Sequence, residues 1–360
     1  MFGLGIGMLW FFGVLLLIVA VGAYLTWVVF PGEDLTAYDH DDGELFGRDE
    51  TCDEHAAIVA SIHMSRKSVA SHNPKQRLQA MRDNMDAMSD GMTFESVITA
   101  VDAGGVSAEW VVAPGVDTSR RLLYIHGGAF SMGSPRSHRN ITNKFSQTAN
   151  AAVLAIDYRL MPEHGRHKGI EDCRNAYLWM LQHGPDGESV PSKVFVSGDS
   201  AGGNLTLMLL LWARDNGIRQ ADAAVALSPT TDATYSSPSI DANHISDPML
   251  GHLFKKLAIT PRPVVLWLSW LGQRVNPSSP LVSPVFADLS NLPPLLVQAS
   301  MAEVLFDDAK RLVNKAVASG SPAKLQSWKH MVHVWHFFYP RLQESVEAWD
   351  EIGKFIAEQQ

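Results

Sequence analysis

Short apolar runs alternate with longer segments of helical spacing from residue 92 onward, and this alternation limits the possible folds more than any other feature. The runs are rich in β-branched and other apolar residues, as buried strands are. Strands separated by helices form mainly parallel sheets whose two faces those helices cover. The pattern therefore predicts an α/β fold with eight strands, at residues 94–100, 108–112, 121–125, 152–156, 193–197, 223–227, 295–298 and 324–328.

The composition is that of a globular protein. Of the 360 residues, 46% are hydrophobic and 19% charged, so disorder is excluded for most of the chain. Two cysteines, Cys52 and Cys173, are too few for a disulfide framework. The formal charge of −9 comes from residues 33–54, which hold ten carboxylates and one cation, Arg48. Because the remainder is neutral, it has no basic surface for a phosphate backbone, and we expect no nucleic-acid partner.

The N-terminal segment is apolar enough to cross a membrane. Residues 1–32 carry no charge, and residues 8–30 exceed the ~20 residues that a spanning helix needs. A cleaved signal peptide is the alternative, with a small-residue site at 21–23, but there is no basic start and the apolar run continues past that site. We therefore predict a single-pass anchor at residues 1–31. Its flanks hold no Lys or Arg, and the acidic run after it favours a folded body outside the cytoplasm.

Two further segments lie outside the alternating pattern. Residues 32–91 are predicted to contain an acidic juxtamembrane stretch followed by one or two helices. Residues 235–275 interrupt the strands with turn signals and an apolar run that includes Trp267 and Trp270. We expect both segments to supply helices to a cap. The tryptophan run suits an apolar lid and an ordinary buried helix equally well.

One serine lies at a sharp junction between a predicted strand and a predicted helix. Residues 198–202 read Gly-Asp-Ser-Ala-Gly, directly after the strand at 193–197. The two glycines allow strand and helix to approach, and a serine on such a turn exposes its hydroxyl. Ser200 is thus a candidate nucleophile, and the alternative is an ordinary helix N-cap serine.

A glycine pair follows the strand at 121–125. Residues 126–130 read His-Gly-Gly-Ala-Phe. Backbone N–H groups without bulky side chains can donate to the negative oxygen that develops during acyl transfer. We expect Gly127 and Gly128, with the N–H of Ala201 after the nucleophile, to form an oxyanion hole. His126 is then a structural residue of this loop.

These motifs resemble the hormone-sensitive-lipase-like branch of the α/β-hydrolases, in which His-Gly-Gly-[Gly/Ala] and Gly-Asp-Ser-Ala-Gly-Gly occur together. The resemblance runs from about residue 122 to the C-terminus and includes Asp-Tyr-Arg-Leu-Met-Pro-Glu-His at 157–164 and Ser-Pro-Leu-Val-Ser-Pro at 279–284. Ala129 replaces a commoner glycine, and residues 165–167 replace a Pro-rich continuation. The resemblance implies that residues 92–360 form an α/β-hydrolase catalytic domain with a helical cap, and that Asp199 supports the oxyanion loop.

The general base follows the acid in this fold, near the C-terminus. His330, His333 and His336 all lie there, and the family pattern Met-x-His-x-[Phe/Trp] selects His333. Their spacing of three could also indicate a metal site, but no nearby Cys or carboxylate completes one, and we expect no metal. His330 and His336 are assigned to the loop and to a helix start.

The acid is predicted from the family pattern Asp-x-Leu-x-Asp-[Asp/Glu]. Residues 303–308 place Glu303 at its first position, shortly after the strand at 295–298. A glutamate can hold the imidazole tautomer as well as an aspartate can. Asp307 is the alternative, although it falls inside the next helix, and a plain surface carboxylate is the default reading of either residue.

The resemblance implies a serine carboxylesterase or lipase-like hydrolase that cleaves lipophilic short- to medium-chain esters. Ser200, His333 and Glu303 would form the triad, and no cofactor is required. The expected partners are a small ester substrate and the membrane; the oligomeric state is not predicted. The alternatives are an amidase or deacetylase on the same fold, and a non-catalytic ligand receptor on that fold.

Overall fold

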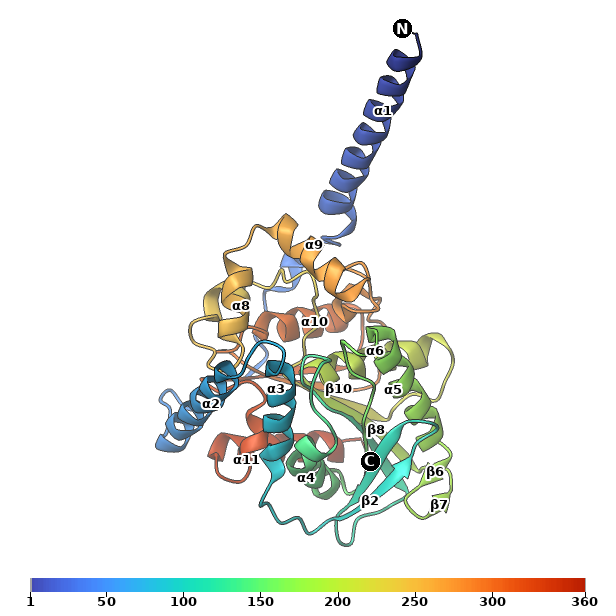
Figure 1. Cartoon of the computed structure of the whole chain (residues 1–360). Helices are drawn as coiled ribbons and strands as arrows, with labels where there is room; N and C mark the ends of the chain where they lie inside the picture. The colour runs from blue at the N-terminus through green and yellow to red at the C-terminus, as the bar shows by residue number, and fades with distance from the viewer. Residues whose placement is uncertain (1, 360) are drawn as a thin grey trace.

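A single nine-stranded sheet organises the molecule, as the computed structural model shows for residues 2–359, with side chains from residue 10 onward (Figure 1). The strand order is β1-β11-β10-β9-β8-β4-β5-β3-β2, and only the β2–β3 and β3–β5 pairs are antiparallel. The predicted mainly parallel α/β sheet is confirmed. Its strands are β1 (Glu44–Phe46), β2 (Val97–Asp102), β3 (Ser107–Val112), β4 (Arg120–Ile125), β5 (Ala152–Ile156), β8 (Lys193–Asp199), β9 (Ala223–Leu227), β10 (Leu295–Ser300) and β11 (Ala323–Trp328).

Helices cover both faces of the sheet because its strands are apolar on both sides. In β4, Leu123 and Ile125 enter one core, and Leu122 and Tyr124 enter the other. One face packs against α5 (Arg166–Met180), α6 (Ala201–Asp215) and α10 (Phe306–Ala318). The opposite face packs against α4 (Arg139–Ala149) and α11 (Gln343–Ala357). A short hairpin, β6 (His183–Gly184) and β7 (Gly187–Glu188), lies outside the sheet.

The acidic segment adds a strand to the sheet, beyond the eight expected. Residues 44–46 pair in parallel with β11 as the edge strand β1. Three carboxylates that precede β1 pair with cations of α10: Glu33 with Lys315, Asp39 with Arg311, and Asp42 with Lys310. The excess negative charge of this segment is therefore partly matched by the helix against which it lies.

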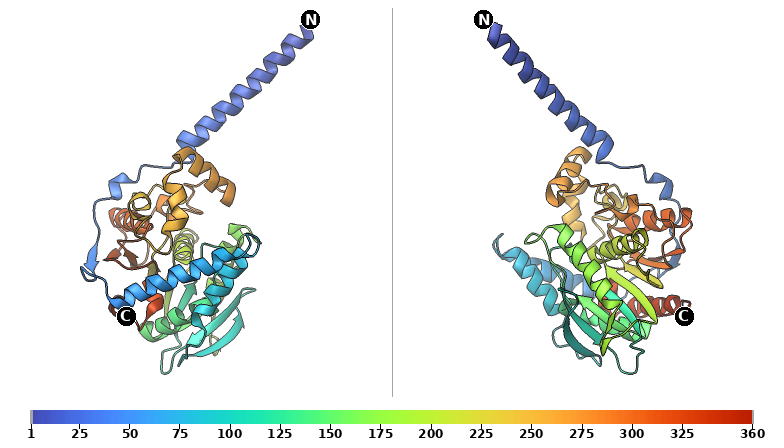
Figure 2. Two further views of the ribbon diagram at one scale, coloured as in Figure 1. Left: turned by 60° about the vertical axis from the view of Figure 1, so that its left-hand side comes forward. Right: turned by 90° about the vertical axis from the view of Figure 1, so that its right-hand side faces the viewer.

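An isolated helix precedes this segment. Helix α1 (Phe2–Tyr24) projects away from the body, and the π-helical turn Leu25–Val29 at its base contacts the body (Figures 1 and 2). Residues 10–29 have a mean hydropathy of 2.4 and are unburied, so this helix is long and apolar enough to cross a membrane. Met1 lies outside the described residues.

Helices from two distant parts of the chain approach one another on one side of the body (Figure 1). The first part contributes α2 (Asp53–Ser71) and α3 (Arg77–Asp86). The second contributes α7 (Ser239–Asn243), α8 (Gly251–Ala258) and α9 (Arg262–Gln273), all inside the expected insertion at 235–275.

The tryptophans of α9 pack against the base of α1 rather than over the sheet. The Trp267 indole donates a hydrogen bond to the Thr26 hydroxyl at 2.9 Å, and both Trp267 and Trp270 contact the Phe30 ring. Both indoles are half-buried. The two tryptophans therefore contact the segment that follows α1, whereas Val265 and Leu266 of the same run are buried.

Candidate active site

Ser200 lies on a strained turn between β8 and α6. Its φ of 53° and ψ of −115° are unfavourable for a residue with a Cβ atom. The flanking glycines are required by close contacts: a Cβ on Gly198 would lie 2.5 Å from the Gly202 carbonyl oxygen, and one on Gly202 would lie 1.9 Å from that of Ile125. The Ser200 N–H donates to the Leu227 carbonyl at 2.8 Å, which fixes the turn to the neighbouring strand β9.

Glu303 and His333 form a buried hydrogen-bonded pair. The imidazole Nδ1 of His333 bonds Oε2 of Glu303, while the Ser300 N–H donates to Oε1 of Glu303 at 2.8 Å. Burial lowers the pKa of His333, but the charge and hydrogen bond of Glu303 outweigh burial, so the pKa lies above its ordinary value of 6.5. This arrangement holds the imidazole orientation and stabilises its protonated form.

The three predicted triad residues follow the carboxyl ends of β8, β10 and β11, where sites form in open α/β sheets. The loop of His333 also adjoins the turn of Ser200. The Val334 N–H donates to the Ser228 hydroxyl at 3.3 Å, and Ser228 directly follows Leu227, the acceptor of the Ser200 N–H.

The alternative acid, Asp307, is engaged elsewhere. Its carboxylate accepts the Ser239 N–H at 2.6 Å and pairs with Lys310 at 2.7 Å. The neighbouring Asp308 accepts the N–H groups of Thr231 and Asp232 at 2.7 and 3.0 Å. Both aspartates therefore anchor the start of the inserted segment to α10.

The other two histidines of the C-terminal loop have different surroundings. His336 is buried, its Nε2 bonds Gln298 Oε1 at 2.7 Å, and burial lowers its pKa to about 3, so it stays neutral. His330 has a left-handed φ of 61° and lines a surface pocket. Neither hydrogen-bonds Glu303.

The glycine loop differs in detail from the expected oxyanion hole. The Gly127 N–H already donates to Asp199 Oδ1 at 2.9 Å, so it is not available to a substrate oxygen. The next residues, Gly128, Ala129 and Phe130, all have positive φ. Within residues 2–359 the N–H groups of Gly128 and Ala129 have no hydrogen-bond partner, and neither has that of Ala201 at the start of α6.

Asp199 holds this loop in place from the residue beside the nucleophile. Besides Gly127, its Oδ1 accepts the Tyr124 hydroxyl at 2.6 Å and lies 3.3 Å from His138 Nε2. Burial raises the pKa of Asp199, but the charge and hydrogen bond of His138 and the Tyr124 bond outweigh burial, and the pKa is lowered. Asp199 is therefore a buried anion.

His126 is placed as a structural residue of the loop would be. Its ring stacks on that of Tyr158, with centroids 4.3 Å apart, and the Tyr158 hydroxyl donates to the His126 carbonyl at 3.0 Å. Burial and the charge of His138 lower the pKa of His126 to about 3.

Sequence reasoning missed a second carboxylate beside the Glu303–His333 pair. Asp247, from the inserted segment, accepts the N–H of Val304, the residue after Glu303, at 3.1 Å. It also accepts the N–H groups of Met249 and Leu250 at 2.9 and 2.8 Å. Burial raises the pKa of Asp247, as does Glu303, while His333 lowers it. No sequence pattern marks this residue, because its role depends on a contact between distant segments.

Comparisons with known proteins identify the family of this chain. A family described as the alpha/beta hydrolase fold matches residues 122–337, which include Ser200, Glu303 and His333. An acetyl-hydrolase of Streptomyces hygroscopicus is 37% identical over 71% of this chain and 81% of its own. The carboxylesterase/phospholipase LipF of Mycobacterium tuberculosis is 33% identical over 72% of this chain and 69% of its own.

Comparison with solved structures identifies the same fold family. An esterase from the bacterial hormone-sensitive lipase family superposes with a TM-score of 0.74 at 34% identity, and the match covers 86% of this chain and 99% of that one. The fold, the motifs and the relatives agree, and the chain belongs to the hormone-sensitive-lipase-like branch of the α/β-hydrolase family.

Proposed function

We propose that this protein is a serine carboxylic ester hydrolase that cleaves lipophilic short- to medium-chain esters through an acyl-enzyme on Ser200. The observation that carries the proposal is the buried Glu303–His333 hydrogen bond at the strand end next to the strained serine turn. The names of the relatives, acetyl-hydrolase, carboxylesterase and esterase, support ester over amide hydrolysis.

In the first half-reaction, Ser200 Oγ attacks the ester carbonyl while His333 Nε2 accepts the hydroxyl proton. The imidazolium, held by Glu303, then gives that proton to the leaving alcohol. In the second half-reaction, water attacks the acyl-enzyme with His333 again as base, and the acid is released.

The oxyanion donors are the N–H groups of Gly128, Ala129 and Ala201. This assignment moves the expected pair one residue along the loop, because Asp199 occupies the Gly127 N–H. The N–H of Ala129 has no hydrogen-bond partner within residues 2–359, so an alanine in place of the commoner glycine is compatible with a role as an oxyanion donor. Each donor contributes about 3 kcal/mol to transition-state stabilisation.

Asp199→Asn is expected to lower kcat by about 10- to 100-fold with little change in KM, because the loop that carries the donors loses its anionic support. Steady-state kinetics with p-nitrophenyl butyrate measures kcat and KM separately. Tyr124→Phe removes one hydrogen bond from the same carboxylate and should lower kcat by less. A rise in KM alone would place Asp199 in substrate binding instead.

The pH dependence follows from the raised pKa of His333. The imidazole must be neutral to accept the serine proton, and a raised pKa keeps the proton on to higher pH. Activity should therefore be lost as pH falls, with the acidic midpoint of kcat/KM above 6.5. In Glu303→Gln the midpoint should move down, because the stabilising charge is gone. A wild-type midpoint below 6.5 would contradict the assignment.

Two measurements test the proposed activity against its alternatives. A fluorophosphonate probe should label Ser200, as found by peptide mass spectrometry, whereas a non-catalytic receptor would remain unlabelled. Matched butyrate ester and butyramide substrates should give a rate ratio in favour of the ester, and the reverse ratio would indicate an amidase. Esters of two to twelve carbons then define the preferred acyl length.

The proposal includes a membrane anchor formed by residues 1–31, with the catalytic body outside the cytoplasm. Helix α9 supports it, because this helix binds the base of α1 and exposes Val264, Leu268 and Leu271. An apolar helix face beside an anchor is suited to the membrane interface.

The full chain is expected to remain in the membrane pellet after alkaline extraction. Val14→Arg with Leu17→Arg should release it in active form, because each central arginine costs about 3 kcal/mol of insertion. Val14→Ala with Leu17→Ala is the matched control. Intact mass spectrometry tests the alternative. A mature chain that begins shortly after residue 23 would contradict the anchor, because the segment would then be a cleaved signal peptide.

A further inference from the structure

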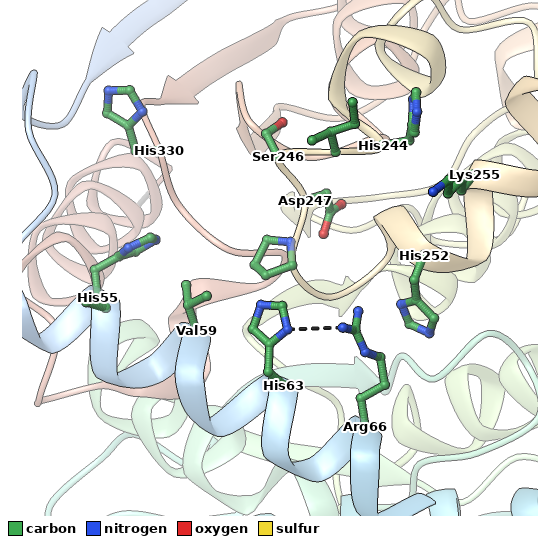
Figure 3. A pocket seen from close by; sticks show the side chains of 13 residues that line it. His55, Val59, His63, Arg66, His244, Ser246, Asp247, His252, Lys255 and His330 are labelled. Atoms are coloured by element: carbon green, nitrogen blue, oxygen red, sulfur yellow. Dashed lines mark hydrogen bonds between the residues drawn. The ribbon is translucent and has the colours of Figure 1, made fainter. Parts of the chain in front are cut away.

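A pocket of about 700 Å³ lies between α2 and the segment that contains α8 (Figure 3). Its lining includes side chains from α2, from residues 244–255 and from the loop before His333, but not Ser200, Glu303 or His333. The three triad residues are therefore not part of the pocket lining, although Asp247 joins that lining to the segment of Glu303. Its size is typical of sites for small organic ligands.

The lining is strongly basic. Arg66 from α2 and Lys255 from α8 are the two cationic side chains of the lining, and they come from different walls. Neither forms an ion pair within the described part of the chain, whereas eight of the seventeen arginines do. Imidazoles from all three segments complete the lining: His55, His63, His244, His252 and His330.

The single carboxylate of the lining, Asp247, forms no ion pair with Arg66 or Lys255. Asp247 already accepts three backbone N–H groups, those of Met249, Leu250 and Val304. Its oxygens are thus committed to the protein backbone, and no side-chain cation is paired with it among residues 2–359.

The pocket also contains hydrogen-bond donors that no protein acceptor within the described residues occupies. Arg66 donates to His63 Nδ1 at 3.1 Å, which leaves the proton of a neutral His63 on Nε2 (Figure 3). Burial lowers the pKa of His252, and the charge of Arg66 lowers it further, as expected in a cationic site.

A metal ion does not suit this lining. Within the described residues no three His, Cys, Asp or Glu side chains lie close enough to share an ion, and Arg66 and Lys255 repel cations. Two opposed cations with several N–H donors instead match an oxyanion that spreads charge over several oxygens, as a phosphate does.

We propose that the α2–α8 pocket binds a small organic phosphate, as a free metabolite or as the headgroup of a lipid. The volume leaves room for an organic portion beside the phosphate. Because Asp247 joins the pocket floor to the residue after Glu303, the ligand would lie directly behind the catalytic pair.

The test is isothermal titration of glycerol 3-phosphate into the full chain in neutral detergent at pH 7 and fixed ionic strength. Arg66→Gln with Lys255→Gln should weaken binding at least tenfold. The control is Lys67→Gln with Lys256→Gln, which removes the same charge from adjacent exposed positions of the same helices and should change affinity less than twofold. No saturable binding to the native chain, or equal loss in the control, would overturn the proposal.

Two further ligands distinguish the source of the phosphate, each measured in both double variants. Inorganic phosphate that binds as tightly as glycerol 3-phosphate shows that the site recognises the phosphate group alone, as it would in a free metabolite, and that the organic portion adds nothing. Dihexanoyl phosphatidic acid that binds more tightly, measured in a Ser200→Ala background to prevent turnover, indicates a lipid headgroup. Either result supports the site only if Arg66→Gln with Lys255→Gln abolishes it, and retention in that variant overturns it.

Hydrolysis of p-nitrophenyl butyrate separates this proposal from the proposed function. Neither Arg66 nor Lys255 belongs to the catalytic site, so their double variant should keep the basal turnover within twofold. Lost phosphate binding with intact turnover supports the pocket as a distinct site. Lost binding with lost turnover and a lowered melting temperature would overturn it as an effect of misfolding.

Discussion

Ser200→Ala is expected to lower kcat for p-nitrophenyl butyrate by about 10⁵- to 10⁶-fold, the scale seen when a triad nucleophile is removed. Without Oγ no acyl-enzyme can form, and the remaining backbone donors stabilise only the slow attack of water. Labelling by a fluorophosphonate should disappear in parallel. The melting temperature should hardly change, because alanine keeps the same backbone strain at φ 53°.

Ser197→Ala is the matched control. Ser197 is buried three residues earlier on the same strand, and its hydroxyl has no hydrogen-bond partner in the described chain. Loss of an unpaired hydroxyl is nearly neutral, so turnover should stay within a few fold of the native value. Turnover by Ser200→Ala close to that of Ser197→Ala would exclude Ser200 as the nucleophile.

Glu303→Gln should lower kcat by about 10³- to 10⁴-fold, as when other triads lose their acid. The amide keeps the volume of the side chain, but it removes the charge that stabilises the imidazolium and can select the wrong tautomer of His333. The measurement is kcat over a pH series, in which the acidic midpoint should also fall, as argued for His333 above.

Asp307→Asn tests the alternative assignment of the triad acid. Asp307 pairs with Lys310 and the Ser239 N–H, so its amide variant should alter stability more than turnover. A collapse of turnover in Asp307→Asn, with Glu303→Gln active, would reverse the assignment of the acid.

The strands were predictable because each buried run has a clear beginning and end. All eight expected runs lie in the sheet, although residues 94–100 are displaced to Val97–Asp102. The edge strand β1 was not predictable: three residues in an acidic segment carry no apolar alternation, and its pairing with β11 depends on cations of a helix far along the chain.

The candidate site was predictable only where a motif lies within one local segment. The turn around Ser200 and the loop at 126–130 are such segments. Which N–H group of that loop is free depends on Asp199, a contact across 72 positions that spacing cannot reveal. Asp247 and the basic pocket were missed for the same reason, because each forms only when the inserted segment meets distant parts of the chain.

The bond from Trp267 to Thr26 and the contact of Phe30 with α9 join the apolar helix to the body with no slack between them. With that helix in a bilayer, no flexible linker would separate the helix from the enzyme. The orientation of the enzyme and its height above the lipid would then be fixed. An enzyme held this way gathers substrate by lateral diffusion in two dimensions, so its rate should follow the surface density of esters in the membrane and not their bulk concentration.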